Sequence, residues 1–154
     1  MFEILNNPTV TFLLGFGISV IVFVSYFGVK VTSRQLTKES AIKAIDILES
    51  VRSDRHILYS IGKSPKHYDS WTPEEKAAAE KVCRAFDILG ILDSSNQISR
   101  RFVDRFYAIP AKELWDACVP YVDSEREKRG PQHLWEFQQL AERVKNVKGK
   151  PSSY

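Results

Sequence analysis

Hydrophobic residues are distributed unevenly along this chain of 154 residues. Positions 4–29 contain no charged residue, and Val, Ile, Leu and Phe supply 13 of the 21 residues at positions 9–29. An α-helix rises about 1.5 Å per residue, so a helix of this length crosses the roughly 30 Å hydrocarbon core of a bilayer. The pattern predicts a transmembrane helix at residues 9–29, preceded by a short extracytoplasmic stub at residues 1–8.

Two other interpretations of this segment are less favourable. A cleaved signal peptide has a basic N-terminal region, a shorter apolar run and small residues at its cleavage site. Residues 1–8 carry Glu3 and no Lys or Arg, and the apolar run is longer than a signal peptide needs. A buried core helix seldom has so long an apolar run. We therefore expect the segment to be retained as an anchor.

The charges that flank the apolar segment predict its orientation. Glu3 precedes it, whereas Lys30, Arg34 and Lys38 follow it. The positive-inside rule places the basic flank in the cytoplasm, which predicts a single-pass protein of the cell (inner) membrane with its N-terminus outside. The three cations are also candidates for contact with anionic lipid headgroups.

Small residues inside the segment leave two interpretations open. Gly15 and Ser19 form a small-xxx-small pair, which lets two membrane helices approach closely. Glycine is also common in membrane helices that do not associate. No ionisable residue lies within the segment, which argues against proton relay or ion conduction through this helix alone.

The remainder of the chain shows helical periodicity. Apolar residues recur at spacings of three and four, and no alternating run typical of a strand is present. Short loops between such segments favour an all-α bundle of about four to five helices within residues 30–147, followed by a flexible tail at 148–154. The predicted core positions are Ala41, Ala44, Ile45, Leu48, Val51, Leu58, Ala78, Val82, Ala85, Phe86, Leu89, Leu114, Trp115, Cys118, Val122, Leu134, Phe137, Leu140, Ala141 and Val144.

Capping residues set the expected helix boundaries. Thr72, Pro73 and Glu75 fit the N-cap, the first position and the third position of a helix, and together they form a capping box. The other predicted features are a loop at 62–70, a helix end between Gly90 and Asn96, a short helix at 100–107 capped by Ser99, a helix from Pro110 that Pro120 kinks or splits, and a last helix from Gly130-Pro131.

Charge gives limited support to nucleic-acid binding. Residues 30–154 hold 22 cations and 18 anions, a net charge of +4. Arg100, Arg101 and Arg105 alternate with aromatic residues, a pattern that can bind nucleic acid, but Asp104 interrupts the cluster. We expect these arginines to be solvated, with the neighbouring phenylalanines turned inward, and we predict no nucleic-acid partner.

Metal-ligand patterns are absent from the sequence. His56, His67 and His133 have no ligand partner at helical spacing. The segment 93–98 resembles the start of a calcium loop, but Ile98 replaces the glycine of the sharp turn and Asp104 replaces the bidentate glutamate. We expect no metal site, and a plain turn between helices at 93–98.

Catalytic motifs are equally absent. Cys83 and Cys118 lie on apolar helix stripes, where a cysteine is usually a small core residue. No phosphate-binding loop or nucleophile elbow occurs in a suitable context. The sequence therefore predicts no catalytic residue, no cofactor and no enzyme activity.

The order of several landmarks resembles the small bacterial membrane-anchored proteins grouped as domain of unknown function 4760. The resemblance covers most of residues 36–145 and implies a helical cytoplasmic domain on one membrane span, without any established activity or catalytic residues. The landmarks are Arg52, Arg55, Trp71, Val82 to Gly90, Asp93 to Ile98, Trp115, Pro120, Arg126 and Trp135 to Leu140.

Two functions remain open from the sequence. The first is an accessory subunit or scaffold that binds the bilayer and other membrane subunits, or a second copy of itself, through its helical body. The second is a membrane-tethered enzyme or nucleotide-binding effector in stress or defence. A polar pocket on which His67, Asp69 or the arginines converge would favour the second, whereas dispersed polar residues would favour the first.

Overall fold

A computed structural model describes residues 38–145, and these residues contain helices and no strand. The predicted all-α fold is confirmed for this range. Residues 38–50 are helical. They are followed by α2 (Arg52–Lys63), a short 3-10 helix η2 (Tyr68–Ser70), α3 (Pro73–Ser94), α4 (Arg100–Phe106), α5 (Ala108–Arg129) and α6 (Trp135–Lys145).

Residues 1–37 and 146–154 lie outside the described range. The predicted stub, the predicted anchor at 9–29 and the predicted tail at 148–154 therefore all fall outside it. Within residues 38–145, no helix combines the length and the apolar character that crossing a bilayer requires. The compact unit that contains the bundle begins at Lys38.

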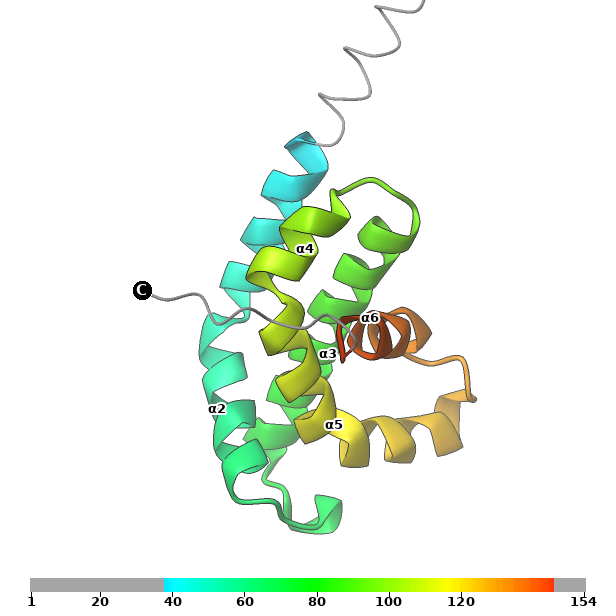
Figure 1. Cartoon of the computed structure of the whole chain (residues 1–154). Helices are drawn as coiled ribbons and strands as arrows, with labels where there is room; N and C mark the ends of the chain where they lie inside the picture. The colour runs from blue at the N-terminus through cyan, green and yellow to red at the C-terminus, as the bar shows by residue number, and fades with distance from the viewer. Residues whose placement is uncertain (1–37, 146–154) are drawn as a thin grey trace, which may run out of the picture. The chain divides into compact units, whose positions relative to one another are not determined.

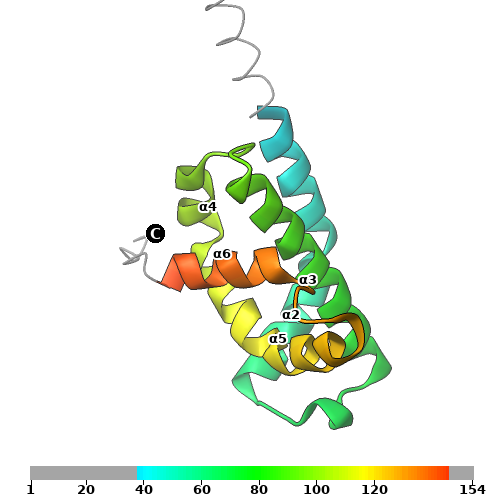
Figure 2. The same ribbon diagram turned by 90° about the vertical axis from the view of Figure 1, so that its right-hand side faces the viewer.

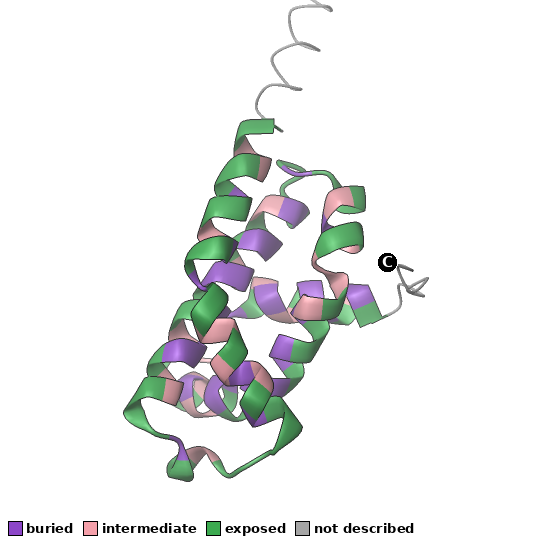
Figure 3. Ribbon diagram, turned by 90° about the vertical axis from the view of Figure 1, so that its left-hand side faces the viewer, coloured by how far each residue is buried: buried purple, intermediate pink, exposed green. Residues whose placement is uncertain are grey.

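The bundle is built around α3 and α5. α2 packs against both of these helices, and α6 crosses both of them on another side, as Figure 2 shows. Buried positions face the spaces between helices, and exposed positions cover the outer surfaces (Figure 3). This arrangement gives each amphipathic helix a partner for its apolar stripe.

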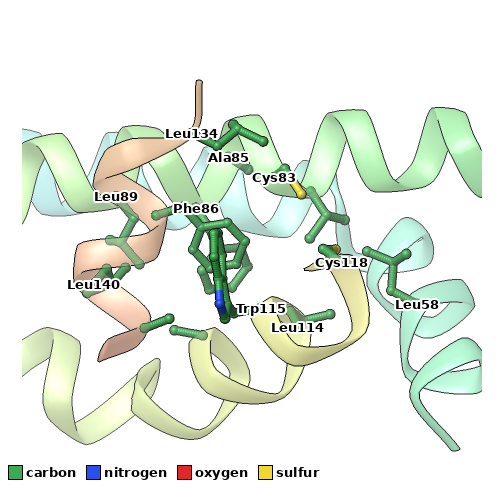
Figure 4. Close-up of a cluster of buried hydrophobic side chains, with 14 of the residues drawn as sticks. Leu58, Cys83, Ala85, Phe86, Leu89, Leu114, Trp115, Cys118, Leu134 and Leu140 are labelled. Carbon is green, nitrogen blue, oxygen red and sulfur yellow. The ribbon is translucent and has the colours of Figure 1, made fainter. Parts of the chain in front are cut away.

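Three aromatic rings occupy the centre of the core. The Phe137 ring of α6 lies with its centroid 5.2 Å from that of Phe86 on α3 and 5.0 Å from that of Trp115 on α5. Phe86 and Phe137 are fully buried, and Figure 4 shows Phe86 and Trp115 among the surrounding aliphatic side chains. Edge-to-face and tilted aromatic pairs of this kind contribute about 0.5–1.5 kcal/mol beyond the burial of their area.

The sequence prediction of the core is confirmed with two qualifications. All of the predicted positions are buried except Ala41, which is partly buried, and Ile45, which is exposed. Ile45 lies at the edge of the helical stripe that carries Ala44 and Leu48, where no neighbouring helix covers it fully.

The capping box at the start of α3 is confirmed. The Glu75 amide donates to Thr72 Oγ1 at 3.2 Å, and the Thr72 amide donates to Glu75 Oε2 at 2.8 Å. Trp71, directly before the cap, is buried, and its indole N–H donates to the Lys66 carbonyl oxygen at 3.3 Å. This bond closes the loop between α2 and α3.

The predicted starts of the last two helices, at Pro110 and at Gly130-Pro131, are wrong. α5 begins at Ala108, two residues before Pro110, and it continues through Pro120 without splitting. Figure 1 shows α5 changing direction near residue 120, as expected where a proline lacks an N–H and crowds the preceding turn. Ser99 occupies the N-cap position of α4, but its side chain makes no capping hydrogen bond.

The last helix begins at Trp135 rather than at Gly130-Pro131. Gly130 has φ 96° and Leu134 has φ 59°, so the chain turns between these residues before the helix starts. A carboxylate from another helix satisfies the new helix end, because the Phe137 amide donates to Asp87 Oδ1 of α3 at 2.9 Å. Capping by a residue 50 positions away cannot be recognised from local sequence.

Arg126 holds α5 to the turn that leads into α6. Its Nε donates to the His133 carbonyl oxygen at 3.0 Å, and its Nη2 donates to Gln138 Oε1 at 2.8 Å. The guanidinium also lies 5.9 Å from the centre of the Trp115 ring. These contacts fix the direction in which α6 crosses the bundle.

Candidate functional site

A groove of about 500 Å³ lies between the C-terminal part of α2, the loop before η2, and the middle of α5. The close approach of α2 and α5 forms part of its floor, since a Cβ on Gly62 would stand 3.4 Å from the Ala117 Cβ. The lining residues are Tyr59, Ile61, Gly62, Lys63, Pro65, Lys66, Trp71, Glu113, Asp116, Ala117 and Pro120.

The rim of the groove carries both signs of charge. Lys63 and Lys66 stand on the loop side, and Glu113 and Asp116 stand on α5. Lys66 forms an ion pair with Glu75, in which the distance from Nζ to Oε2 is 2.7 Å. Partial burial, with the nearby Glu113 carboxylate, raises the pKa of the Tyr59 phenol. The groove suits a small, largely apolar molecule or side chain with a polar end.

This groove differs from the pocket that would indicate an enzyme. His67 and Asp69 belong to the loop around η2 but do not line the groove, and its lining contains no arginine. His67 Nδ1 instead lies 3.2 Å from Asp69 Oδ2, with both side chains exposed. The residues whose convergence on a pocket would favour an enzyme or nucleotide effector, namely His67, Asp69 and the arginines, are therefore not part of this groove.

A second surface feature is an apolar patch, defined here as Ile88 and Ile91. Ile88 and Ile91 lie one helical turn apart on α3, with 40% and 46% of their surface exposed. Trp135, 43% exposed, begins α6. Gly90, on another side of α3, is in direct contact with Glu136, the residue after Trp135, where α3 and α6 cross. Large apolar side chains grouped in this way are typical of contact surfaces.

The membrane residues predicted from the sequence are mostly outside the described range. The helix-packing pair Gly15 and Ser19 and the headgroup candidates Lys30 and Arg34 precede it. Lys38 is its first residue and is exposed. These assignments stay predictions.

The two cysteines lie in the core, as predicted, whereas the three histidines are exposed or partly buried. His56 and His67 are exposed and His133 is partly buried, and residues 38–145 contain no group of three potential metal ligands. Cys83 and Cys118 are fully buried and not linked by a disulfide. Burial, together with the adjacent Cys118 thiol, raises the pKa of the Cys83 thiol well above its ordinary value, which makes this thiol a poor nucleophile.

Sequence reasoning missed a charged cluster where α3, α4 and α6 meet. Arg143 Nη2 of α6 lies 2.9 Å from Asp93 Oδ2, and Arg143 Nη1 donates to Asp104 Oδ1. Asp93 is buried, and its Oδ1 has no hydrogen-bond partner among the described residues. Asp93 lies in the last turn of α3, and the connection to α4 runs over residues 95–99, two residues later at its start than the predicted turn at 93–98. The available signal in the sequence was Asp93, a charged residue at a position where the α3 core stripe predicts an apolar one.

Comparisons with family models, with curated proteins and with solved structures give no significant match. The resemblance to domain of unknown function 4760 therefore remains a prediction.

Proposed function

We propose that the chain is a non-enzymatic, single-pass membrane protein whose helical body acts as an accessory subunit or scaffold of a membrane protein complex. In this proposal residues 9–29 form the anchor and residues 30–147 form a cytoplasmic domain. The uncharged apolar run at 4–29 and the basic flank that follows it support this assignment. Its partners are the bilayer and either other membrane subunits or further copies of the chain.

The apolar patch of Ile88 and Ile91 carries the proposal of an interaction module. Neither residue belongs to the buried core, and a large part of each apolar side chain remains in solvent. Apolar surface gains roughly 25 cal/mol for each Å² removed from water. A partner that covers the patch therefore gains stability from residues that the isolated body leaves in solvent.

Membrane attachment is tested by fractionation of the full chain. We expect it to sediment with membranes and to resist alkaline extraction, and we expect a variant that lacks residues 1–29 to be released. Release of the full chain by lysis without detergent would contradict the anchor.

The interaction module is tested by measuring the mass of the full chain purified in mild detergent. We expect a stoichiometric complex or a homo-oligomer, which Ile88→Glu with Ile91→Glu dissociates. The matched control places the same charges on the exposed side of α2, as Ser53→Glu with His56→Glu, and keeps the assembly. A solitary wild-type monomer would contradict the proposal.

The alternative, a membrane-tethered enzyme or nucleotide-binding effector, has weaker support. The carboxylates of Glu113 and Asp116 stand on the same rim as Lys63 and Lys66. With two carboxylates opposite two lysines, one of which is paired with Glu75, the rim has no excess of positive charge for a polyanionic nucleotide.

A further inference from the structure

Among the described residues, Asp104 forms its ion pair with Arg143 of α6 and not with the three arginines of its own helix, α4. Arg100, Arg101 and Arg105 are exposed, and none of them forms an ion pair with another residue of the range 38–145. Asp104 is the acidic residue of α4, and it is held by Arg143 of α6. Arg143 is shared between Asp93 and Asp104, so the four arginines and two aspartates of this region carry a net charge of +2 (4 − 2), and the three arginines of α4 are its exposed charges.

Apolar side chains lie beside these charges. Phe106 at the end of α4 is 53% exposed, and Ile109 in the first turn of α5 is 61% exposed. The Arg105 guanidinium lies 5.5 Å from the centre of the Phe106 ring. The expectation that the phenylalanines of this helix turn inward is therefore wrong for Phe106. Exposed cations next to exposed apolar groups are typical of surfaces that lie at a lipid interface.

α4 lies at the same end of the helical body as Lys38. Figures 1 and 2 show α4 at the end of the body where residue 38 begins the first helix, with η2 at the opposite end. Only residues 30–37 separate Lys38 from the predicted membrane segment. Eight residues reach at most about 30 Å when fully extended, which is the greatest distance that the proposed anchor leaves between its end and Lys38.

We propose that the α4 face, defined as Arg100, Arg101, Arg105, Phe106 and Ile109, docks on anionic lipid headgroups of the bilayer that holds the anchor. This proposal rests on the membrane attachment proposed above. The anchor makes docking an intramolecular step, so a modest attraction per residue is sufficient. Each arginine within about 8 Å of an anionic surface shifts the equilibrium toward the docked state by roughly fivefold.

The experiment uses the full chain reconstituted into bilayers of phosphatidylcholine, with or without 30% phosphatidylglycerol. A polarity-sensitive fluorophore is attached at Gln97→Cys, beside α4, or at Ser64→Cys, at the far end of α2. The native cysteines are buried and do not compete for the label. Quenching by spin-labelled lipids then reports how near each site lies to the bilayer.

We expect anionic lipid to increase quenching at position 97 and not at position 64. The triple variant Arg100→Gln, Arg101→Gln, Arg105→Gln should lose this response, by a factor of about 100 in the docking equilibrium, while it remains in the membrane. The matched control Arg52→Gln, Lys63→Gln, Arg84→Gln removes three other exposed cations and should keep the response.

Two results would overturn the docking proposal while leaving the anchor intact. One is a position-97 signal that is the same in neutral and anionic bilayers, as expected if the α4 face binds a protein or nucleic acid instead. The other is a triple variant that responds like the wild type. Failure of the anchor itself gives a different result, because the chain would then be extracted from both kinds of bilayer at alkaline pH.

Discussion

Gly90 of α3 lies directly against the main chain of Glu136 in α6. A Cβ placed on Gly90 would stand 2.5 Å from the Glu136 carbonyl oxygen and 2.7 Å from its carbonyl carbon. No real Cβ approaches backbone atoms this closely, so the crossing of α3 and α6 depends on a glycine at this position.

Gly90→Ala should destabilise the protein by about 2 kcal/mol or more, because α6 must move away from α3 to make room. The measurement is urea unfolding followed by circular dichroism. Gly62→Ala is the control: its Cβ would stand in ordinary contact, 3.4 Å from the Ala117 Cβ, and removing a glycine from α2 should leave stability unchanged or raise it. Equal effects of the two substitutions would contradict the tight crossing.

Arg143→Met should destabilise the protein by roughly 3 kcal/mol, because it leaves the buried Asp93 carboxylate without a counterion. Asp93→Leu combined with Arg143→Met should recover much of this loss, since no buried charge then remains. Chemical unfolding of the two single variants and the double variant measures this coupling. Additive effects would show that the two side chains do not act as a pair.

The capping box predicts a specific dependence on pH. The hydrogen bond from Lys66, and that from the Thr72 amide, lower the pKa of Glu75 below its ordinary value. Because the folded-state pKa is the lower one, Glu75 stabilises the protein above the ordinary glutamate value of about 4.3, and this contribution is lost as the pH falls further. Thermal unfolding between pH 3 and pH 7 should therefore show a weaker acid dependence for Glu75→Gln.

Thr72→Ala removes the other half of the box and should cost about 1 kcal/mol at every pH in this range. Thr72→Ser should restore most of the stability, because its hydroxyl can accept the same hydrogen bond from the Glu75 amide. A Thr72→Ala variant as stable as the wild type would indicate that the cap contributes nothing.

Cys83 and Cys118 should resist thiol reagents in the folded protein. Both side chains are fully buried, and the pKa of Cys83 is raised, so little thiolate is present and reagents have no access. We expect modification by a chromogenic disulfide at pH 8 to follow global unfolding, with both thiols reacting in denaturant. Rapid reaction of the native protein would contradict the buried placement.

Local patterns predicted those parts of the fold that local interactions control. The capping box at Thr72 and the core stripe of α3 follow from residues three and four positions apart, which share one face of a helix. The start of α6 was missed because its cap, Asp87, comes from another helix. The exposure of Phe106 was missed because spacing alone does not show which side of a seven-residue helix the bundle covers.

The sequence by itself determined that residues 38–145 form helices with apolar stripes, and that their histidines and cysteines form no recognisable metal or catalytic motif. Those properties depend on the period of the α-helix and on ligand spacing, both of which are local. Only the tertiary structure decided that Arg143 pairs with both Asp93 and Asp104, and that a groove opens between α2 and α5. Each of these relations joins segments far apart in the chain, and helix packing determines which of them meet.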